Sequence, residues 1–173
     1  MTDEGAPTGP VGRLLQVLCD ICAVVGGIVL IAMALMTVVS VIGRAWFASP
    51  ILGDVELVQL GMAGCVATFL PYTQFRRSNI IVDFFTTRAS LKTQTRMDGL
   101  GTLFYTLVMA MIAWRVYVGG VWSRESEETS MLMALPIWLA YMLMVPGLAL
   151  SALVGIYQTV LYWRYGPEWE SRQ

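Results

Sequence analysis

Three cysteines are the side chains of this sequence best suited to covalent chemistry. Cys19 and Cys22 form a C-x-x-C pair, the spacing used by thiol oxidoreductases, and Cys65 is the third cysteine. A membrane thiol oxidoreductase also needs a second cysteine pair on the opposite side, which one further cysteine does not supply. The sequence contains no histidine, which excludes a histidine-ligated zinc or haem site and a histidine general base. We therefore expect inert thiols and no enzyme activity, catalytic residue, cofactor or metal.

Catalytic residue types are scarce because the chain is unusually apolar. Its 173 residues are 57% hydrophobic and 13% charged, about half the ~25% charged residues of a soluble domain. Charged residues bracket long apolar runs; the 23 uncharged residues 21–43 would form a helix about 34 Å long, enough to cross a hydrocarbon core of about 30 Å. We predict an all-α membrane protein with four transmembrane helices, at about 21–43, 57–75, 99–118 and 136–157.

The positions of basic residues indicate an orientation. Placing the N-terminus in the cytoplasm leaves eight basic residues on the cytoplasmic side and three on the other. By the positive-inside rule, this predicts N-in/C-in topology. The net charge of −1 provides no basic surface for nucleic acid. Residues 1–12 are expected to be a disordered polar segment, 13–165 a single membrane domain and 166–173 a cytoplasmic tail.

The segment between the second and third spans has its own pattern. Ile80, Phe84 and Leu91 recur at roughly helical spacing, while Arg88 and Lys92 occupy another side at an interval of four. This pattern favours a short amphipathic helix lying on the cytoplasmic face of the bilayer. A solvated polar loop is the alternative.

The spans lack the residues of a transport pathway. Ionisable groups that bind ions or substrate are normally found inside the membrane, whereas Arg44, Glu56, Arg76 and Arg115 all fall at predicted span ends. This distribution favours an auxiliary or scaffolding subunit over a carrier that acts alone.

Small residues predict where another helix packs. Gly147, Ser151 and Gly155 recur every four residues and would form a smooth ridge along the fourth span. Such ridges allow close helix approach in lipid, although glycine is common in membrane helices in general. The sequence leaves open whether the packing partner belongs to this chain or to another.

Several motifs resemble the small (Q) membrane subunit of tripartite ATP-independent periplasmic (TRAP) transporters. The resemblance runs from Arg13 to Trp163, in the order and spacing of four spans. Its elements are Gly43-Arg44-Ala45-Trp46-Phe47, Gly53-Asp54-Val55-Glu56-Leu57, Arg76-Arg77-Ser78-Asn79-Ile80-Ile81-Val82-Asp83, Leu135-Pro136-Ile137-Trp138 and Pro146-Gly147. Ser78-Asn79-Ile80 stands where the family usually has Gly-x-His, so a charge switch at that position is lost.

The resemblance implies a function that composition alone does not show. In this family a periplasmic solute-binding protein delivers an organic acid or similar solute to a membrane pair of Q and M subunits. The large M subunit carries the substrate and sodium sites, and Q acts as its scaffold in the bacterial inner membrane. The alternative is a four-span anchor or accessory subunit of another membrane complex.

The resemblance also suggests which residues make contacts. Arg44 and Glu56 flank the first outer loop and would form an ion pair that joins the first two spans. Arg76 and Arg77 would hold anionic membrane lipid. Ordinary interfacial anchoring is the alternative for each. The candidate partner or lipid contacts are Arg44, Glu56, Arg76, Arg77, Asp83, Gly147, Ser151 and Gly155.

Overall fold

The computed structural model describes residues 10–47, 51–76 and 91–165, and this part of the chain is almost entirely helical. All of its helices are long and apolar enough to cross a membrane. They are α1 (Pro10–Phe47), α2 (Asp54–Phe75), α4 (Leu91–Glu125) and α5 (Trp138–Tyr165). The described residues include no named strand, and a single isolated bridge joins Thr129 to Pro136 in the α4–α5 connection. The predicted all-α membrane fold with four spanning helices is confirmed.

The helices extend beyond the predicted spans. At 1.5 Å per residue, the 38 residues of α1 reach about 57 Å, so the helix continues past a ~30 Å hydrocarbon core or tilts within it. It begins at Pro10, a residue favoured in the first turn because proline lacks an N–H. Residues 10–12 therefore belong to α1 and not to the polar segment predicted over 1–12.

The predicted interfacial helix falls mainly on residues 77–90, which lie outside the described residues. Its last part, from Leu91 onward, forms the start of α4. In the described chain, these residues are thus continuous with the third span. The interfacial helix itself stays a prediction.

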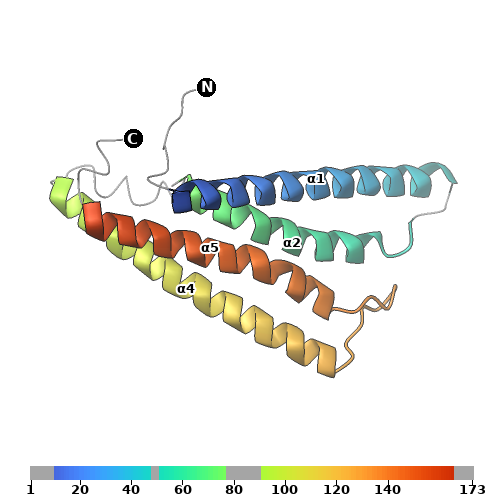
Figure 1. Cartoon of the computed structure of the whole chain (residues 1–173). Coiled ribbons are helices and arrows are strands. Elements are labelled where there is room, and N and C mark those ends of the chain that lie inside the picture. Colours follow the sequence, from blue (N-terminus) through green and yellow to red (C-terminus); the bar gives the residue numbers. More distant parts are fainter. Residues whose placement is uncertain (1–9, 48–50, 77–90, 166–173) are drawn as a thin grey trace.

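The helices lie side by side in the order α1, α2, α5, α4 (Figure 1). Neighbours in this order make almost all the interhelix contacts, and α1 touches α5 only slightly. The start of α1 and the end of α5 share one end of the bundle, here called the terminal end. The end of α1, the start of α2 and the α4–α5 connection lie at the opposite end, called the hairpin end. Each central helix therefore has two neighbours, and each outer helix has essentially one.

The buried residues of the bundle concentrate on α5. Val154 is fully buried, and Leu148, Ala152 and Leu161 are nearly so. On α1 the buried positions are mostly small, including Cys19, Gly26 and Ser40. Because the core is thin, close approach of backbones contributes much of the packing, as is usual where lipid supplies no hydrophobic drive between helices.

The predicted small-residue ridge on α5 packs inside the chain. A Cβ at Gly147 would overlap the carbonyl group of Ala67 on α2, and a Cβ at Gly155 would overlap the side chain of Thr106 on α4. Between them, the Ser151 hydroxyl lies 2.6 Å from the Tyr105 hydroxyl and is completely buried. The ridge packs against α2 and α4 within the chain, which answers the question that the spacing left open. Contact of these three residues with a partner protein or lipid stays a prediction.

Candidate functional site

Charged residues of the hairpin end form the first part of a polar cluster that joins α1 to α2. Ser40 donates a hydrogen bond to Asp54, with 2.6 Å between Oγ and Oδ2. The Arg44 guanidinium lies 3.4 Å from the same carboxylate oxygen. Asp54 also accepts a bond from the backbone N–H of Val55 at 2.8 Å, in the first turn of α2, where the helix dipole favours a negative charge.

Glu56 forms the second part of the cluster and connects α2 to the α4–α5 connection. Its carboxylate accepts a hydrogen bond from the Ser130 hydroxyl at 2.7 Å. It also accepts the backbone N–H groups of Leu132 at 2.7 Å and Met133 at 3.0 Å. Hydrogen bonds to an ionised carboxylate are roughly twice as strong as neutral ones. One side chain therefore fixes the conformation of a connection more than 70 residues away.

Gly53 allows the α4–α5 connection to approach the start of α2 closely. Its φ of 73° places it in the left-handed region, which glycine adopts without steric cost. A Cβ at this position would also overlap the side chain of Met133. Glycine is thus needed here both for its backbone conformation and for the close approach of the α4–α5 connection.

The predicted Arg44–Glu56 ion pair is wrong, because Arg44 pairs with Asp54. The physical reason is the geometry of α2: residues two apart point in directions about 200° different around a helix. Asp54 and Glu56 therefore cannot both face α1. Asp54 binds α1 and Glu56 binds the α4–α5 connection, so the polar cluster of Ser40, Arg44, Asp54, Glu56 and Ser130 joins α1, α2 and that connection. We call this set the hairpin clamp.

At the terminal end, a pair of buried amides joins α2 to α5. Gln74 donates through Nε2 to Oε1 of Gln158 at 2.8 Å. Gln158 in turn donates to the backbone carbonyl oxygen of Gln74 at 2.9 Å. Neither glutamine belongs to a motif or a periodic pattern of the sequence. Their signal was polarity alone, since a glutamine near the end of an apolar span often hydrogen-bonds to another helix.

The remaining predicted contact residues have mixed outcomes. The Arg76 guanidinium carbon lies 5.4 Å from the centre of the Tyr72 ring, a cation–π distance, so this charge already has a contact within the chain. Arg77 and Asp83 fall outside the described residues. The three cysteines are free thiols, and Cys65 contributes to packing by donating to the Gly26 carbonyl across 3.4 Å.

The outer helices present large apolar surfaces. On α1, Val24, Ile28, Ile31 and Leu35 are each 62% exposed and recur along one side. On α4, Phe104 and Leu107 are similarly exposed. In the described part of the chain, no group of three or more histidine, cysteine or carboxylate side chains converges as a metal site would require. The geometry thus consists of an internally braced layer of helices with apolar outer faces.

This geometry agrees with the result of a comparison with protein families. Residues 33–164, about three quarters of the chain, match the family model described as "Tripartite ATP-independent periplasmic transporters, DctQ component". The chain belongs to this family. The resemblance found from the sequence motifs is therefore confirmed. The match begins inside α1, includes all of α2 and α4, and ends one residue before the end of α5.

Membership defines the broad role. As a DctQ component, the chain is the small permease subunit of a tripartite transporter and a multi-pass membrane protein. The family is one of transporter subunits and is not known as a family of enzymes. Comparisons with curated proteins and with solved structures find no significant match.

Proposed function

We propose that this DctQ component is a scaffold that supports a large M transmembrane subunit in the inner membrane of a bacterium. In this role the complex carries out sodium-coupled uptake of an organic acid or similar solute, which a periplasmic solute-binding protein delivers. The M subunit supplies the sodium and substrate sites. The DctQ component supplies a braced surface on which M is held.

The observation that carries this proposal is that the outer helices expose large apolar surfaces while polar contacts join the elements of the bundle to one another. Helix α1 has essentially one neighbour within the chain, and the side formed by Val24, Ile28, Ile31 and Leu35 is left apolar and exposed. A large exposed apolar surface on a membrane helix contacts either lipid or another protein. Since stable complexes commonly bury at least about 1,200 Å² in total, α1 and α4 offer enough length for such an interface.

The hairpin clamp supports the scaffold role because it restrains relative motion. Asp54 ties α2 to α1, and Glu56 ties α2 to the connection that joins α4 to α5. A moving carrier needs interfaces that slide or open, whereas these contacts join α1, α2 and the α4–α5 connection to one another. Ionisable groups of the clamp lie at a helix end and not at mid-membrane, so they brace the subunit and do not line a solute pathway.

The orientation follows from the charge distribution: both termini lie in the cytoplasm and the hairpin end faces the periplasm. Single cysteines at Ser126 and Ser90, each in a chain whose own cysteines are replaced by serine, test this. The exposed Ser126 should react with a membrane-impermeant thiol reagent in whole cells, and the cysteine at Ser90 only after lysis. The reverse labelling pattern contradicts the orientation without affecting the scaffold proposal.

Reconstitution tests the function. Alone in liposomes with a sodium gradient, the chain should carry none of the radiolabelled organic acid that the cognate binding protein retains on purification. With the M subunit and the loaded binding protein, it should be required for uptake, and it should elute with M on gel filtration. Sodium-driven uptake by this chain alone, or full uptake by M and the binding protein without it, contradicts the proposal.

Three tryptophan variants test whether the exposed side of α1 contacts M. Ile28→Trp and Ile31→Trp enlarge the exposed side of α1, where we expect contact with M, and should reduce the fraction of chain that elutes with M. Leu107→Trp makes the same kind of change on α4, at a site that is equally exposed, and reports whether that outer helix also contacts M. If none of the three variants alters co-elution, the outer helices face lipid and the proposed interface is wrong.

A further inference from the structure

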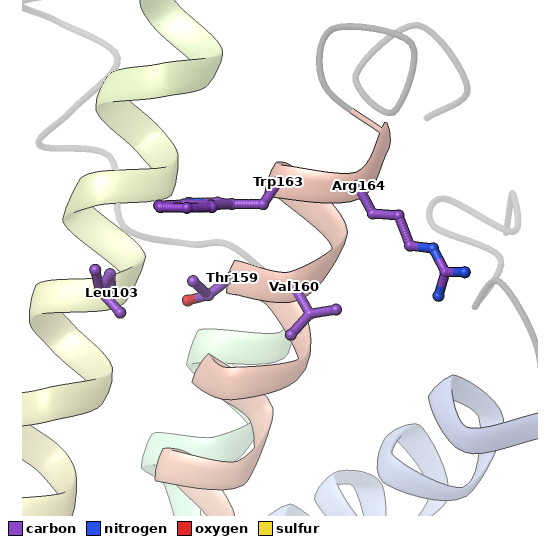
Figure 2. A pocket seen from close by; sticks show the side chains of 5 residues that line it. All are labelled: Leu103, Thr159, Val160, Trp163 and Arg164. Carbon is purple, nitrogen blue, oxygen red and sulfur yellow. The ribbon is translucent and has the colours of Figure 1, made fainter.

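A groove opens between α4 and α5 near the terminal end of the bundle (Figure 2). It has a volume of about 520 Å³ and is lined by Leu103, Thr159, Val160, Trp163 and Arg164. The Trp163 ring extends from α5 toward α4, on the side of the groove nearest the end of α5. The ring lies against α4 at Gly99, where a Cβ would be 3.6 Å from the indole nitrogen, an ordinary van der Waals distance.

The walls of the groove are apolar, and its rim carries one positive charge. The Thr159 hydroxyl donates its one proton to the Gly155 carbonyl at 2.8 Å, so it has no donor left for a ligand. Leu103 and Val160 add only hydrocarbon. Arg164 lies one helical turn beyond Val160, at the end of α5 where a span leaves the membrane. No lining residue of this groove is acidic.

The apolar walls match the acyl chains of a phospholipid, and the positive charge at the rim matches an anionic headgroup. A tryptophan at a span end marks the level of the headgroups, so the apolar walls lie at the depth of acyl chains and Arg164 at the depth of phosphates. A basic side chain beside a groove between transmembrane helices on one face of the membrane attracts anionic headgroups. From Thr159 to Arg164 the lining residues cover about 7.5 Å of α5, which is too short for a partner helix to lie along it.

We propose that this groove binds one anionic phospholipid, with an acyl chain against Leu103 and Val160 beside the Trp163 ring and its phosphate on Arg164. The lipid comes from the leaflet that faces the terminal end. It occupies the groove that residues of both helices line. The proposal requires only that the chain spans a membrane, so it stands or fails separately from the scaffold function.

Native mass spectrometry of the full-length chain in detergent tests the proposal, with phosphatidylglycerol and phosphatidylcholine of identical acyl chains as probes. We expect one phosphatidylglycerol to bind in preference to phosphatidylcholine. Arg164→Gln should weaken phosphatidylglycerol binding about fivefold, the loss that corresponds to ~1 kcal/mol for one basic residue near the membrane surface. Arg13→Gln is the matched control, since Arg13 is an exposed cation at the same end of the bundle but does not line the groove.

A second pair of variants tests the apolar half of the site without changing charge. Leu103→Trp fills the groove and should abolish the bound lipid, whereas Leu107→Trp, one turn away on α4 and outside the groove, should leave it in place. Three results overturn the proposal: equal binding of the two lipids to the unmodified chain, equal effects of Arg164→Gln and Arg13→Gln, or retention of the lipid by Leu103→Trp. Displacement by millimolar inorganic phosphate also overturns it, because the ligand would then be a free anion. All variants alter exposed side chains, and circular dichroism verifies that each remains folded.

Discussion

Helices α1 and α5 are both long and apolar, yet they occupy opposite environments in this protein. Helix α1 is the more apolar of the two and is exposed along most of its length. Helix α5 lies between two neighbours and carries more buried residues than any other described helix. Hydrophobicity therefore does not identify the interior of this bundle. The difference lies in the small and polar residues of α5, which permit close contact and interhelical hydrogen bonds where lipid cannot.

The largest expected effect comes from adding one methyl group to the centre of the bundle. Gly147→Ala places a Cβ against the Ala67 carbonyl, and a backbone atom cannot move aside as a side chain can. We expect a loss of about 1–3 kcal/mol, measured as a lower thermal midpoint in detergent. Gly27→Ala on α1 is the control, because nothing lies within 4 Å of its Cβ position. Alanine there should be neutral or stabilising by about 0.5–1 kcal/mol. Equal thermal midpoints for Gly147→Ala and Gly27→Ala would show that α5 is packed no more closely than α1.

Removing a buried amide should have the next largest effect. Gln158→Leu deletes the hydrogen bonds that Gln158 makes with the side chain and backbone of Gln74. Interhelical hydrogen bonds in membranes contribute up to about 1.7 kcal/mol, so we expect a loss of ~1–2 kcal/mol in chemical unfolding. Thr37→Val on α1 also deletes a hydrogen bond, but an exposed one to its own helix, and should change stability by less than about 0.5 kcal/mol. A larger loss from Thr37→Val would reverse the comparison.

Neutralising Glu56 should increase the mobility of the α4–α5 connection more than it lowers the stability of the whole bundle. Glu56→Gln keeps the shape of the side chain but loses the charge that strengthens its bonds to Ser130, Leu132 and Met133. We expect a small loss of stability and faster proteolysis within residues 126–137. Glu125→Gln changes a neighbouring exposed carboxylate that has no part in the clamp and should leave the cleavage rate unchanged. An unchanged rate in Glu56→Gln would show that the connection is held by other contacts.

The smallest effect is expected for Arg44. Its side chain is 61% exposed, and exposed ion pairs contribute about 0–1 kcal/mol, less at high salt. Arg44→Gln should therefore lower stability slightly at low ionic strength and not at all in 0.5–1 M salt. Ser40→Ala should cost more, because it removes a fully buried donor to the same carboxylate. A larger cost for Arg44→Gln would mean that the charge, and not the buried hydroxyl, holds α1 to α2.

Much of the fold could be read from the sequence because a membrane imposes a length and a polarity on each span. The ridge of Gly147, Ser151 and Gly155 could also be predicted, since spacing alone places these residues on one side of α5. Their partners could not, because spacing gives no information about which helix lies opposite. The Arg44–Glu56 prediction failed for a related reason: both residues flank one loop, but the direction of each side chain depends on where α2 begins. Gln74 and Gln158 are 84 residues apart, and no local pattern connects them.

The distance in sequence between Glu56 and its donors has a consequence for biosynthesis. Ser130 follows Glu56 by 74 residues, so at a synthesis rate of ~5–20 residues per second the carboxylate waits about 4–15 s for the connection that it binds. During that interval α1 and α2 exist as a hairpin whose acidic group has only water or headgroups as partners. Glu56 therefore makes its hydrogen bonds late in synthesis. A nascent chain that stalls before Ser130 leaves this carboxylate without its protein donors, which distinguishes the incomplete chain from the finished subunit.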